Sequence, residues 1–466
     1  MNSTPPVAAN ADGTGVFGRL AQGDVIPEKT FESVAGKLLL LVVMVLMCIG
    51  VLVVYSSGAG WGVRNFKDSE YFLWRQVLYA LGGTVVIFAV GSTDYKLLRK
   101  FSKVILIVSA ALLMLLLMMK AAGLIHGAAR WIGYGRFRFQ ASDMAKVALI
   151  IHLAHLIAEK QNHIKDLNRA YYPMITIVMV IVGLVAFEPN FSTASVIALI
   201  AFVMMFVGRV SLKHIGVTAL AVLPMAAAFA IAAPYRMARL LTFAGKGSES
   251  GDYQITQALL GLGNGGVFGL GPGASKQREL FLPASYNDFI FAVVGEEYGF
   301  IGATVILLLF LAVILCGISV AKNSQDDFGR NLAFGITASL GIYAFINAGV
   351  ACHLLPTTGL AMPFISFGGS AALFNSIGVG LLLSISREKK REEKRKAKAA
   401  KKQAERAALK IFEVAEPIIA TDANADKARQ PTAAKTESME ESDTAWLEKL
   451  YGKSGSRAKG NEQPFL

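Results

Sequence analysis

Ten apolar runs, each long enough to cross a lipid bilayer as a helix, follow one another along this sequence. Inside a bilayer the backbone must satisfy its own hydrogen bonds, and a helix of about 20 apolar residues does so across the hydrocarbon core. Hydrophobic residues make up 54% of the chain and charged residues 17%, which excludes an ordinary water-soluble domain. We therefore predict an all-α, polytopic membrane protein with about ten transmembrane helices. The runs fall near residues 35–55, 72–92, 101–120, 142–158, 172–187, 192–208, 214–233, 289–317, 332–353 and 367–386.

Polar stretches outside these runs divide the chain into three parts. We expect a polar cytoplasmic segment at 1–34, the membrane domain at 35–386, and a basic, largely disordered cytoplasmic tail at 387–466. The tail opens with twelve basic and four acidic residues in 387–410. Beside a final membrane helix, this tract attracts anionic lipid and fixes orientation more simply than it binds nucleic acid. We expect no nucleic-acid partner.

Basic residues predict the orientation of the chain in the membrane. If the N-terminus is cytoplasmic, the cytoplasmic connections carry many Lys and Arg residues, as the positive-inside rule requires. These residues are Lys96, Arg99, Lys100, Lys103, Lys160, Lys165, Arg169, Arg209, Lys213, Lys322 and Arg330. The protein is then expected in the cytoplasmic membrane, with both termini in the cytoplasm.

The longest outer connection, residues 234–288 between the seventh and eighth helices, is long for a compact membrane protein, which favours a functional role. It contains Arg236 and Arg239, and a glycine-rich stretch at 261–273. A phosphate-cradling loop would need a strand–turn–helix context that is missing here. We interpret the glycine-rich stretch as a flexible surface loop that reshapes around a substrate.

The other notable outer connection, residues 127–146, carries Arg130, Arg136 and Arg138 on the side where short loops normally avoid positive charge. Lys146 lies one helical turn after Asp143, so the two can form an ion pair. An intramembrane lysine costs about 2.5–3.5 kcal/mol, which favours a pyrophosphate or lipid-phosphate site over a mere ion pair with interfacial anchors.

No metal site is expected from the sequence. His152, His155 and Glu159 share a helical face, but they fall at the cytoplasmic end of the fourth helix without a fourth ligand. The three cysteines lie in or beside apolar runs without paired spacing, which indicates core packing and not a disulfide framework or a zinc site.

The stretch "NDFIFAVVGEEYGFIG", residues 287–302, places Asp288 just before a long apolar run and Glu296 and Glu297 inside it. Asp288 is expected at the outer membrane edge, where water reaches it and where a carboxylate can do chemistry. The glutamates lie two turns deeper and must be buried against partners or protonated. Below the aspartate, small residues recur at helical spacing, which lets another helix approach closely. They are Ala292, Gly295 and Gly299.

Several motifs together resemble the SEDS family (shape, elongation, division and sporulation), which includes FtsW, RodA and SpoVE. They are "GAARWI" with "FQASDMAKVALI", "YQITQALLGLGNGG", "LPASYNDFIFAVVGEEYGFIG" and "LLPTTGLAMPFISFGGSA". The resemblance runs from about residue 36 to residue 388. Two positions depart from the family pattern: "EPNFSTA" has Asn190 and Ser192 where P-D-x-G-T-A is common, and Asp143 replaces a glutamate. The long polar N-terminus and basic tail are similar to the FtsW branch.

The resemblance implies a peptidoglycan glycosyltransferase that joins lipid II units at the outer face of the cytoplasmic membrane, during division and at the septum. It implies that Asp288 is the general base, while Arg130, Lys146 and Arg236 or Arg239 hold the developing pyrophosphate charge. Further candidate substrate contacts are Asp143, Gln254, Gln257, Glu296 and Ser370. A divalent cation, Mg²⁺ or Mn²⁺, could assist at the pyrophosphate, although no ligand cluster in the sequence establishes one.

The resemblance also implies a class B penicillin-binding protein, a transpeptidase, as partner, together with other division proteins. Three alternatives stay open: an elongation-type, RodA-like polymerase, a lipid II flippase and a noncatalytic scaffold. Ten helices with intramembrane charge would suit a transporter, but the two halves of the sequence show no internal repeat. A scaffold would need neither Asp288 nor the cationic outer loop.

The charge asymmetry leads to a prediction of topology. Residues 121–141 and 234–288 are expected outside, and residues 387–466 inside. A cysteine placed at position 270 should react with an impermeant reagent added to intact cells. Labelling at this position only from the cytoplasmic side would overturn the model.

Overall fold

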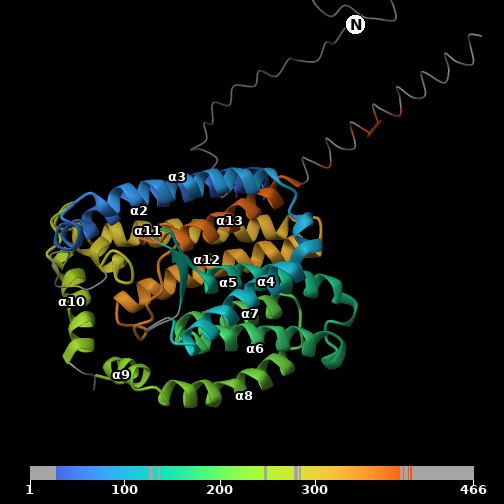
Figure 1. The fold of residues 1–466 in the computed structure, drawn as a ribbon. Helices are drawn as coiled ribbons and strands as arrows, with labels where there is room; N and C mark the ends of the chain where they lie inside the picture. Colours follow the sequence, from blue (N-terminus) through green and yellow to red (C-terminus); the bar gives the residue numbers. More distant parts are fainter. Residues whose placement is uncertain are drawn as a thin grey trace, which may run out of the picture. The chain divides into compact units, whose positions relative to one another are not determined.

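The computed structural model describes residues 28–124, 130–134, 137–245, 249–277, 282, 285–388, 392, 397, 399–400 and 403. Residues 1–392 form one compact unit and residues 393–466 a second one. All helices discussed below belong to the first unit (Figure 1).

Ten long apolar helices cover the ten predicted runs. Among the described residues, nine meet the length and hydropathy of a membrane span, and α7, with 17 residues, is a shorter apolar helix. The prediction of a polytopic helical membrane protein is therefore confirmed. The helices are α2 (Glu28–Phe66), α3 (Tyr71–Ser92), α4 (Lys96–Ala121), α5 (Ala141–Glu159), α6 (Tyr172–Phe187), α7 (Phe191–Val207), α8 (Leu212–Ile231), α11 (Ile290–Lys322), α12 (Asp327–Ala351) and α13 (Gly369–Ser386).

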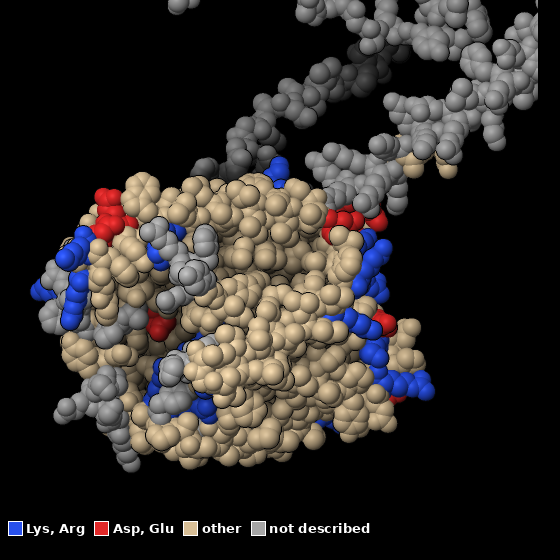
Figure 2. Space-filling view, in the orientation of Figure 1, with Lys and Arg blue, Asp and Glu red and all other residues tan. Residues whose placement is uncertain are grey.

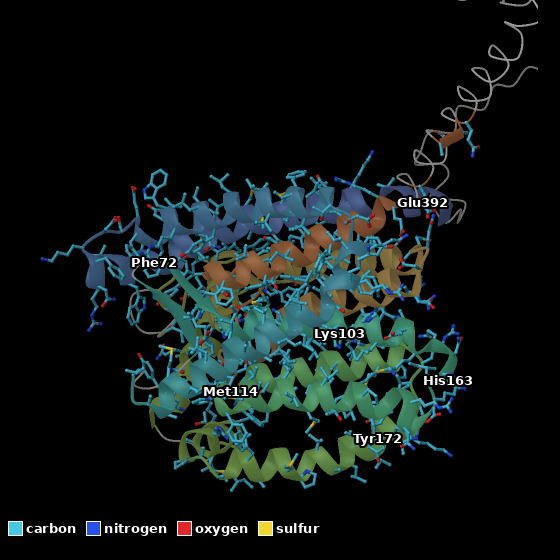
Figure 3. The ribbon with its side chains drawn as sticks, turned by 45° about the vertical axis from the view of Figure 1, so that its right-hand side comes forward. Phe72, Lys103, Met114, His163, Tyr172 and Glu392 are labelled. Atoms are coloured by element: carbon cyan, nitrogen blue, oxygen red, sulfur yellow. The ribbon has the colours of Figure 1, made fainter. Side chains whose placement is uncertain are left out.

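Successive long helices run in opposite directions, so their connections gather at two ends. We call "site end" the end that holds the connections 67–70, 122–140, 188–190, 232–289 and 352–368. Both connections predicted to be outside lie there. The opposite end carries the short turns η1 (Gln161–His163) and η2 (Leu167–Tyr171). Figure 3 shows His163 at that end and Phe72 at the site end, and Figure 2 shows Lys and Arg side chains at both ends.

Burial separates interior helices from peripheral ones. Most residues in the apolar windows of α5, α12 and α13 are buried, whereas fewer than a quarter are buried in those of α3, α4 and α8. α12 packs against α5, α7, α11 and α13, which makes it the central helix. Exposed apolar helices suit contact with lipid, while the buried helices can carry polar groups inward.

A short hairpin at the site end leads into α5, and it was not anticipated from the sequence. β1 (Trp131–Tyr134) pairs antiparallel with β2 (Phe137–Gln140), with Trp131 opposite Gln140. Because β2 runs directly into α5, the hairpin fixes both Arg130, just before β1, and the first turn of α5. Arg136 lies outside the described residues, and so does the side chain of Arg138.

The connection between α8 and α11 contains two helices, α9 (Pro234–Phe243) and α10 (Glu249–Gly265). The interpretation of residues 261–273 as a loop was therefore wrong for residues 261–265, which are helical, whereas residues 266–273 lie outside any helix or strand. Residues 261–265 end α10, and the following residues form backbone hydrogen bonds with α11: Leu270 N–H donates to Glu296 O over 2.9 Å, and Phe300 N–H donates to Gly266 O over 2.9 Å.

The stripe of small residues on α11 is the surface on which α10 packs, as predicted. A Cβ atom on Gly295 would meet the side chain of Leu262, and one on Gly299 would meet the backbone of Val267 and Gly269. Gly299 has φ 67° and ψ −166°, a conformation that only glycine adopts readily, and it kinks α11. The glycines thus serve close packing and not flexibility.

A polar cluster at the opposite end anchors the end of α13. The Tyr95 hydroxyl hydrogen-bonds with Asp326 Oδ1 at 2.5 Å and also with Glu388, and Lys96 forms an ion pair with Glu388. Burial and both carboxylates raise the pKa of Tyr95, so its hydroxyl keeps its proton. The cluster joins the α3–α4 turn, the α11–α12 turn and the residues after α13.

The contact between α10 and α11 leads to a test of stability. A methyl group at Gly265 would meet the backbone of Gly295, whereas one at Gly263, in the same helix, would meet open space. Gly265→Ala should therefore lower the free energy of unfolding by about 1–3 kcal/mol. Gly263→Ala should be neutral or stabilise by up to about 1 kcal/mol. Thermal melting of both purified variants in detergent measures this, and equal melting temperatures would contradict the packing.

Candidate active site

Asp288 lies in the turn 285–289, two residues before α11, so it precedes the helix and does not head its small-residue stripe. The buried side chain of Asn347, on α12, donates through Nδ2 to the backbone carbonyl of Asp288 over 3.0 Å and to that of Leu360 over 2.7 Å. The Ser366 hydroxyl donates to the carbonyl of Asn287 over 2.7 Å. The backbone of Asp288 is therefore fixed by α12 and by the connection 352–368.

The carboxylate of Asp288 is half-buried. Burial raises its pKa, and Arg239 and Arg130 act against that rise. Its Oδ1 atom has no hydrogen-bond partner among the residues that the structure describes. Figure 2 shows a hollow toward the site end of the molecule, with acidic atoms at its floor and basic side chains along its border. A carboxylate with an unused acceptor can take a proton from a ligand hydroxyl.

Arg130 interacts electrostatically with two carboxyl groups. Its Nη2 atom donates to the carbonyl of Pro189, and its guanidinium interacts electrostatically with both Asp288 and Glu188. Glu188 is fully buried, and burial raises its pKa to about 8 despite Arg130. The charge of Arg130 is therefore only partly compensated by Glu188 near neutral pH.

A second polar group lies at the start of α5. The Nζ atom of Lys146 lies 3.8 Å from Asp143 Oδ1 and 4.2 Å from the ring centre of Tyr343, on α12. The Ser370 hydroxyl interacts with Asp143 and accepts a hydrogen bond from the N–H group of Gln140 over 3.1 Å. The predicted pairing of Asp143 with Lys146 is confirmed, and Ser370 joins it from α13.

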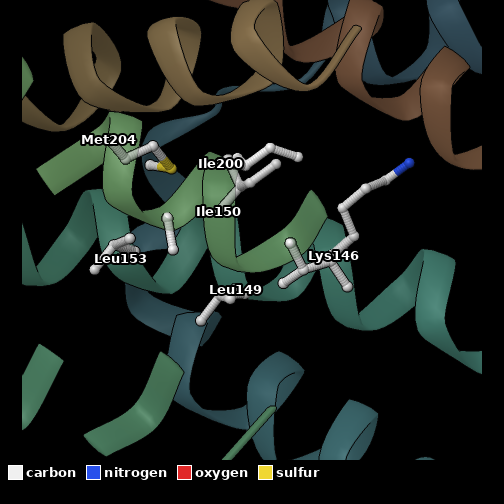
Figure 4. Close-up of a pocket in the computed structure, with 8 residues that line it drawn as sticks. Lys146, Leu149, Ile150, Leu153, Ile200 and Met204 are labelled. Carbon is white, nitrogen blue, oxygen red and sulfur yellow. The ribbon is translucent and has the colours of Figure 1, made fainter. Parts of the chain in front are cut away.

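An apolar crevice extends from Lys146 between α5 and α7 (Figure 4). It has an empty volume of about 180 Å³, yet it is too narrow to admit a water molecule. The ammonium of Lys146 points away from the apolar side chains. Because the crevice offers neither room nor polar partners beyond this lysine, we regard it as a packing gap. Its apolar lining consists of Leu149, Ile150, Leu153, Ile197, Ile200, Ala201 and Met204.

Two predicted site residues, Arg236 and Glu296, form their contacts away from Asp288. Arg236 donates to the carbonyl of Phe229 over 2.7 Å and lies 4.0 Å from the centre of that ring, so it is engaged with α8. The fully buried Glu296 accepts hydrogen bonds from the Ser275 hydroxyl and from the N–H groups of Lys276 and Gln277. Glu296 thus ties the segment after α10 to α11.

The remaining predicted residues lie in the long connection. Arg239, which is exposed on α9, donates to the carbonyl of Thr357 over 3.2 Å and interacts electrostatically with Asp288. Gln254 and Gln257 are half-buried on α10. The structure therefore brings Arg130 and Arg239 into the field of Asp288, and a role for the two glutamines stays a prediction.

Asn190 has a structural role that explains how the chain accommodates it. Its Nδ2 atom donates to the Ser142 hydroxyl over 3.2 Å, and its Oδ1 atom accepts from the Thr193 hydroxyl over 2.8 Å. These bonds join the first turns of α5 and α7. An amide does this well because it both donates and accepts.

Glu188, Tyr343 and Asn347 were not among the site residues predicted from the sequence. Asn347 and Tyr343 are polar groups inside the apolar helix α12, and this was the available signal. In the described part of the chain, no group of three or more His, Cys, Asp or Glu side chains is placed to hold a metal ion. Asp288 has arginines as its charged neighbours, which does not fit a protein-held divalent cation, and we derive no step through one.

The chain is similar to a known protein family and to curated proteins. A family model described as "Cell cycle protein", for FtsW, RodA and SpoVE, matches residues 36–391. A probable peptidoglycan glycosyltransferase FtsW of Geobacter sulfurreducens is 38% identical over 354 residues, which cover 76% of this chain and 95% of the relative. Stage V sporulation protein E of Bacillus subtilis is 36% identical over 352 residues, which cover 75% of this chain and 96% of the relative.

Solved structures share the fold. A chain from a structure of a peptidoglycan synthase complex, described as coordinating polymerization and crosslinking, aligns with a TM-score of 0.60 and 24% identity over 75% of this chain and 97% of that chain. The rod shape determining protein RodA of Thermus thermophilus aligns with a TM-score of 0.55 and 24% identity, over 75% of this chain and 96% of that chain. At this identity the likeness shows the architecture.

We call the two hydrogen bonds that Asn347 donates, to the carbonyls of Asp288 and Leu360, the Asn347 clamp. This clamp leads to a second test of stability. Asn347→Leu would leave the carbonyls of Asp288 and Leu360 without this donor, at a cost of about 1–3 kcal/mol in the free energy of unfolding. Asn323→Leu changes an exposed asparagine in the α11–α12 turn and serves as the control. Thermal melting in detergent compares them. The clamp is refuted if both variants melt at the same temperature.

Proposed function

The chain belongs to the FtsW/RodA/SpoVE family of cell cycle proteins, and from this membership and the surroundings of Asp288 we propose that it is a peptidoglycan glycosyltransferase. Its substrate is lipid II, which it polymerises into glycan strands. The observation that carries the proposal is a half-buried carboxylate at the site end, with an unused acceptor oxygen among the described residues and two guanidinium groups in its field. One site thus supplies a base and cations for an anionic leaving group.

Asp288 acts on the acceptor. A sugar hydroxyl of one substrate attacks the anomeric carbon of the other, and Asp288 takes the hydroxyl proton as the new C–O bond forms. The bond between that carbon and the pyrophosphate oxygen breaks, and its electron pair leaves with undecaprenyl pyrophosphate. The clamp from Asn347 holds the backbone of Asp288 in place during this step.

Cations stabilise the leaving group. Negative charge on the bridging oxygen grows in the transition state, and preorganised cations there lower the barrier. Arg130 and Arg239 are the candidates beside Asp288, and Lys146 is the candidate at the start of α5. Arginine suits this role because its planar group can bind phosphate oxygens in a bidentate manner.

The membrane setting follows from the same proposal. The site end faces the outer side of the bacterial cytoplasmic membrane, both termini are cytoplasmic, and the protein works at the division septum. A class B penicillin-binding protein crosslinks the strand that it makes, and divisome proteins surround the pair. The similarity to a chain from a peptidoglycan synthase complex supports a partner of this kind. The basic tail contacts anionic lipid.

Replacing the base tests the activity. Asp288→Asn keeps the shape of the side chain and removes proton acceptance, so lipid II polymerisation should fall by about 10²–10⁴-fold. The purified variant, with and without its transpeptidase partner, is given labelled lipid II, and glycan polymer is measured. Asp327→Asn, at the opposite end, where the side chain is 44% exposed and pairs with Arg330, is the control and should keep wild-type activity.

Two results would count against this assignment. Polymerisation by Asp288→Asn at the wild-type rate would show that Asp288 is not the base. A wild-type protein that moves lipid II across vesicle membranes but makes no polymer would indicate a flippase, which has no need of a base.

A further inference from the structure

The ammonium of Lys146 rests on an aromatic ring. Its Nζ atom lies 4.2 Å from the ring centre of Tyr343, within the range of a cation–π interaction. The Lys146 side chain is 3% exposed, so it is removed from water. Its ion pair with Asp143 spans 3.8 Å, which is longer than a hydrogen bond. The ring is therefore a principal contact of this buried charge.

A ring stabilises an ammonium differently from a carboxylate or a carbonyl. The attraction comes from the negative face of the π-system and is strongest where water is excluded. It fixes the position of the charge without placing a lone pair on each N–H group. A lysine held in this way keeps donors for an incoming oxygen atom, while one that is fully hydrogen-bonded to the protein must break those bonds first.

We propose that Tyr343 is a positioning residue, which holds the ammonium of Lys146 over its ring so that Lys146 can bind a phosphate oxygen of the lipid-linked donor. The inference rests on the proposed function. Tyr343 lies on α12, the helix that also supplies Asn347. One central helix thus positions both the base, through Asn347, and a cation, through Tyr343.

The ring of Tyr343, and not its hydroxyl, carries this role. The hydroxyl oxygen is buried and has no hydrogen-bond partner among the residues that the structure describes. Phenylalanine would keep the ring face and lose only this hydroxyl. Leucine would keep an apolar side chain and lose the ring.

Lipid II polymerisation by the full-length protein with its transpeptidase partner tests the proposal. Tyr343→Phe should keep kcat/KM within about threefold, whereas Tyr343→Leu should lower it about tenfold or more, as expected for a desolvated cation–π contact. In a Lys146→Met background, which removes the ammonium, Tyr343→Leu should have no further effect, because the two residues act as a pair. Melting temperature and membrane abundance identify variants that fail to fold.

A graded variant keeps the test independent of folding. Phenylalanines that carry one, two or three fluorine atoms, incorporated at position 343, weaken the negative ring face with little change in shape. Polymerisation should decline with each added fluorine if the ring holds the ammonium. Equal activity across this series, or equal activity of Tyr343→Phe and Tyr343→Leu, would overturn the role of Tyr343. A Lys146→Met protein with normal activity would instead refute the proposed role of Lys146 itself.

Discussion

The side-chain amide of Asn347 is the contact on which the site depends. It joins the carbonyl of Asp288, at the entry to α11, to the carbonyl of Leu360, in the connection before α13. Three segments, the entry to α11, α12 and the connection after α12, meet at this group, which is 1% exposed. Hydrogen bonds in so dry a place are strong, and leaving them unmade is costly, so the turn that carries Asp288 has little freedom to move.

Buried charges in this protein divide into those that hold the fold and those left for chemistry. Glu296 accepts hydrogen bonds from three consecutive residues after α10, and Glu297 accepts one from Ser56 on α2. These glutamates therefore fasten helices together. Asp288 differs, because two arginines, Arg239 and Arg130, act electrostatically on its carboxylate. The carboxylates of Glu296 and Glu297 thus stabilise the fold, whereas we propose that the carboxylate of Asp288 acts in catalysis.

Local patterns in the sequence predicted much of this architecture. The ten helices follow from apolar runs of bilayer length, the ion pair of Lys146 with Asp143 follows from their spacing, and the packing face of α11 follows from its small residues. Each of these features is encoded within a single segment.

Contacts between distant segments could not be predicted in this way. The glycine-rich stretch was interpreted as a flexible loop, whereas its first five residues are helical and Gly265 packs closely on the backbone of Gly295 in α11. Likewise, the hydrogen bond from Asn347 to the carbonyl of Asp288 joins residues 59 positions apart, a separation that carries no periodic signal.

The pH dependence of polymerisation by the wild-type protein tests the central claim most directly. A general base must be deprotonated to act, and burial raises the pKa of Asp288 above the ordinary aspartate value of about 3.9. At lipid II concentrations well below KM, where the rate reports kcat/KM and therefore the free enzyme, the initial rate should fall as the pH decreases through this raised pKa, with about one proton taken up. The fold must stay intact over the range, as thermal melting at each pH can show. A rate that stays constant down to about pH 4 in folded protein would contradict catalysis by Asp288 as a base.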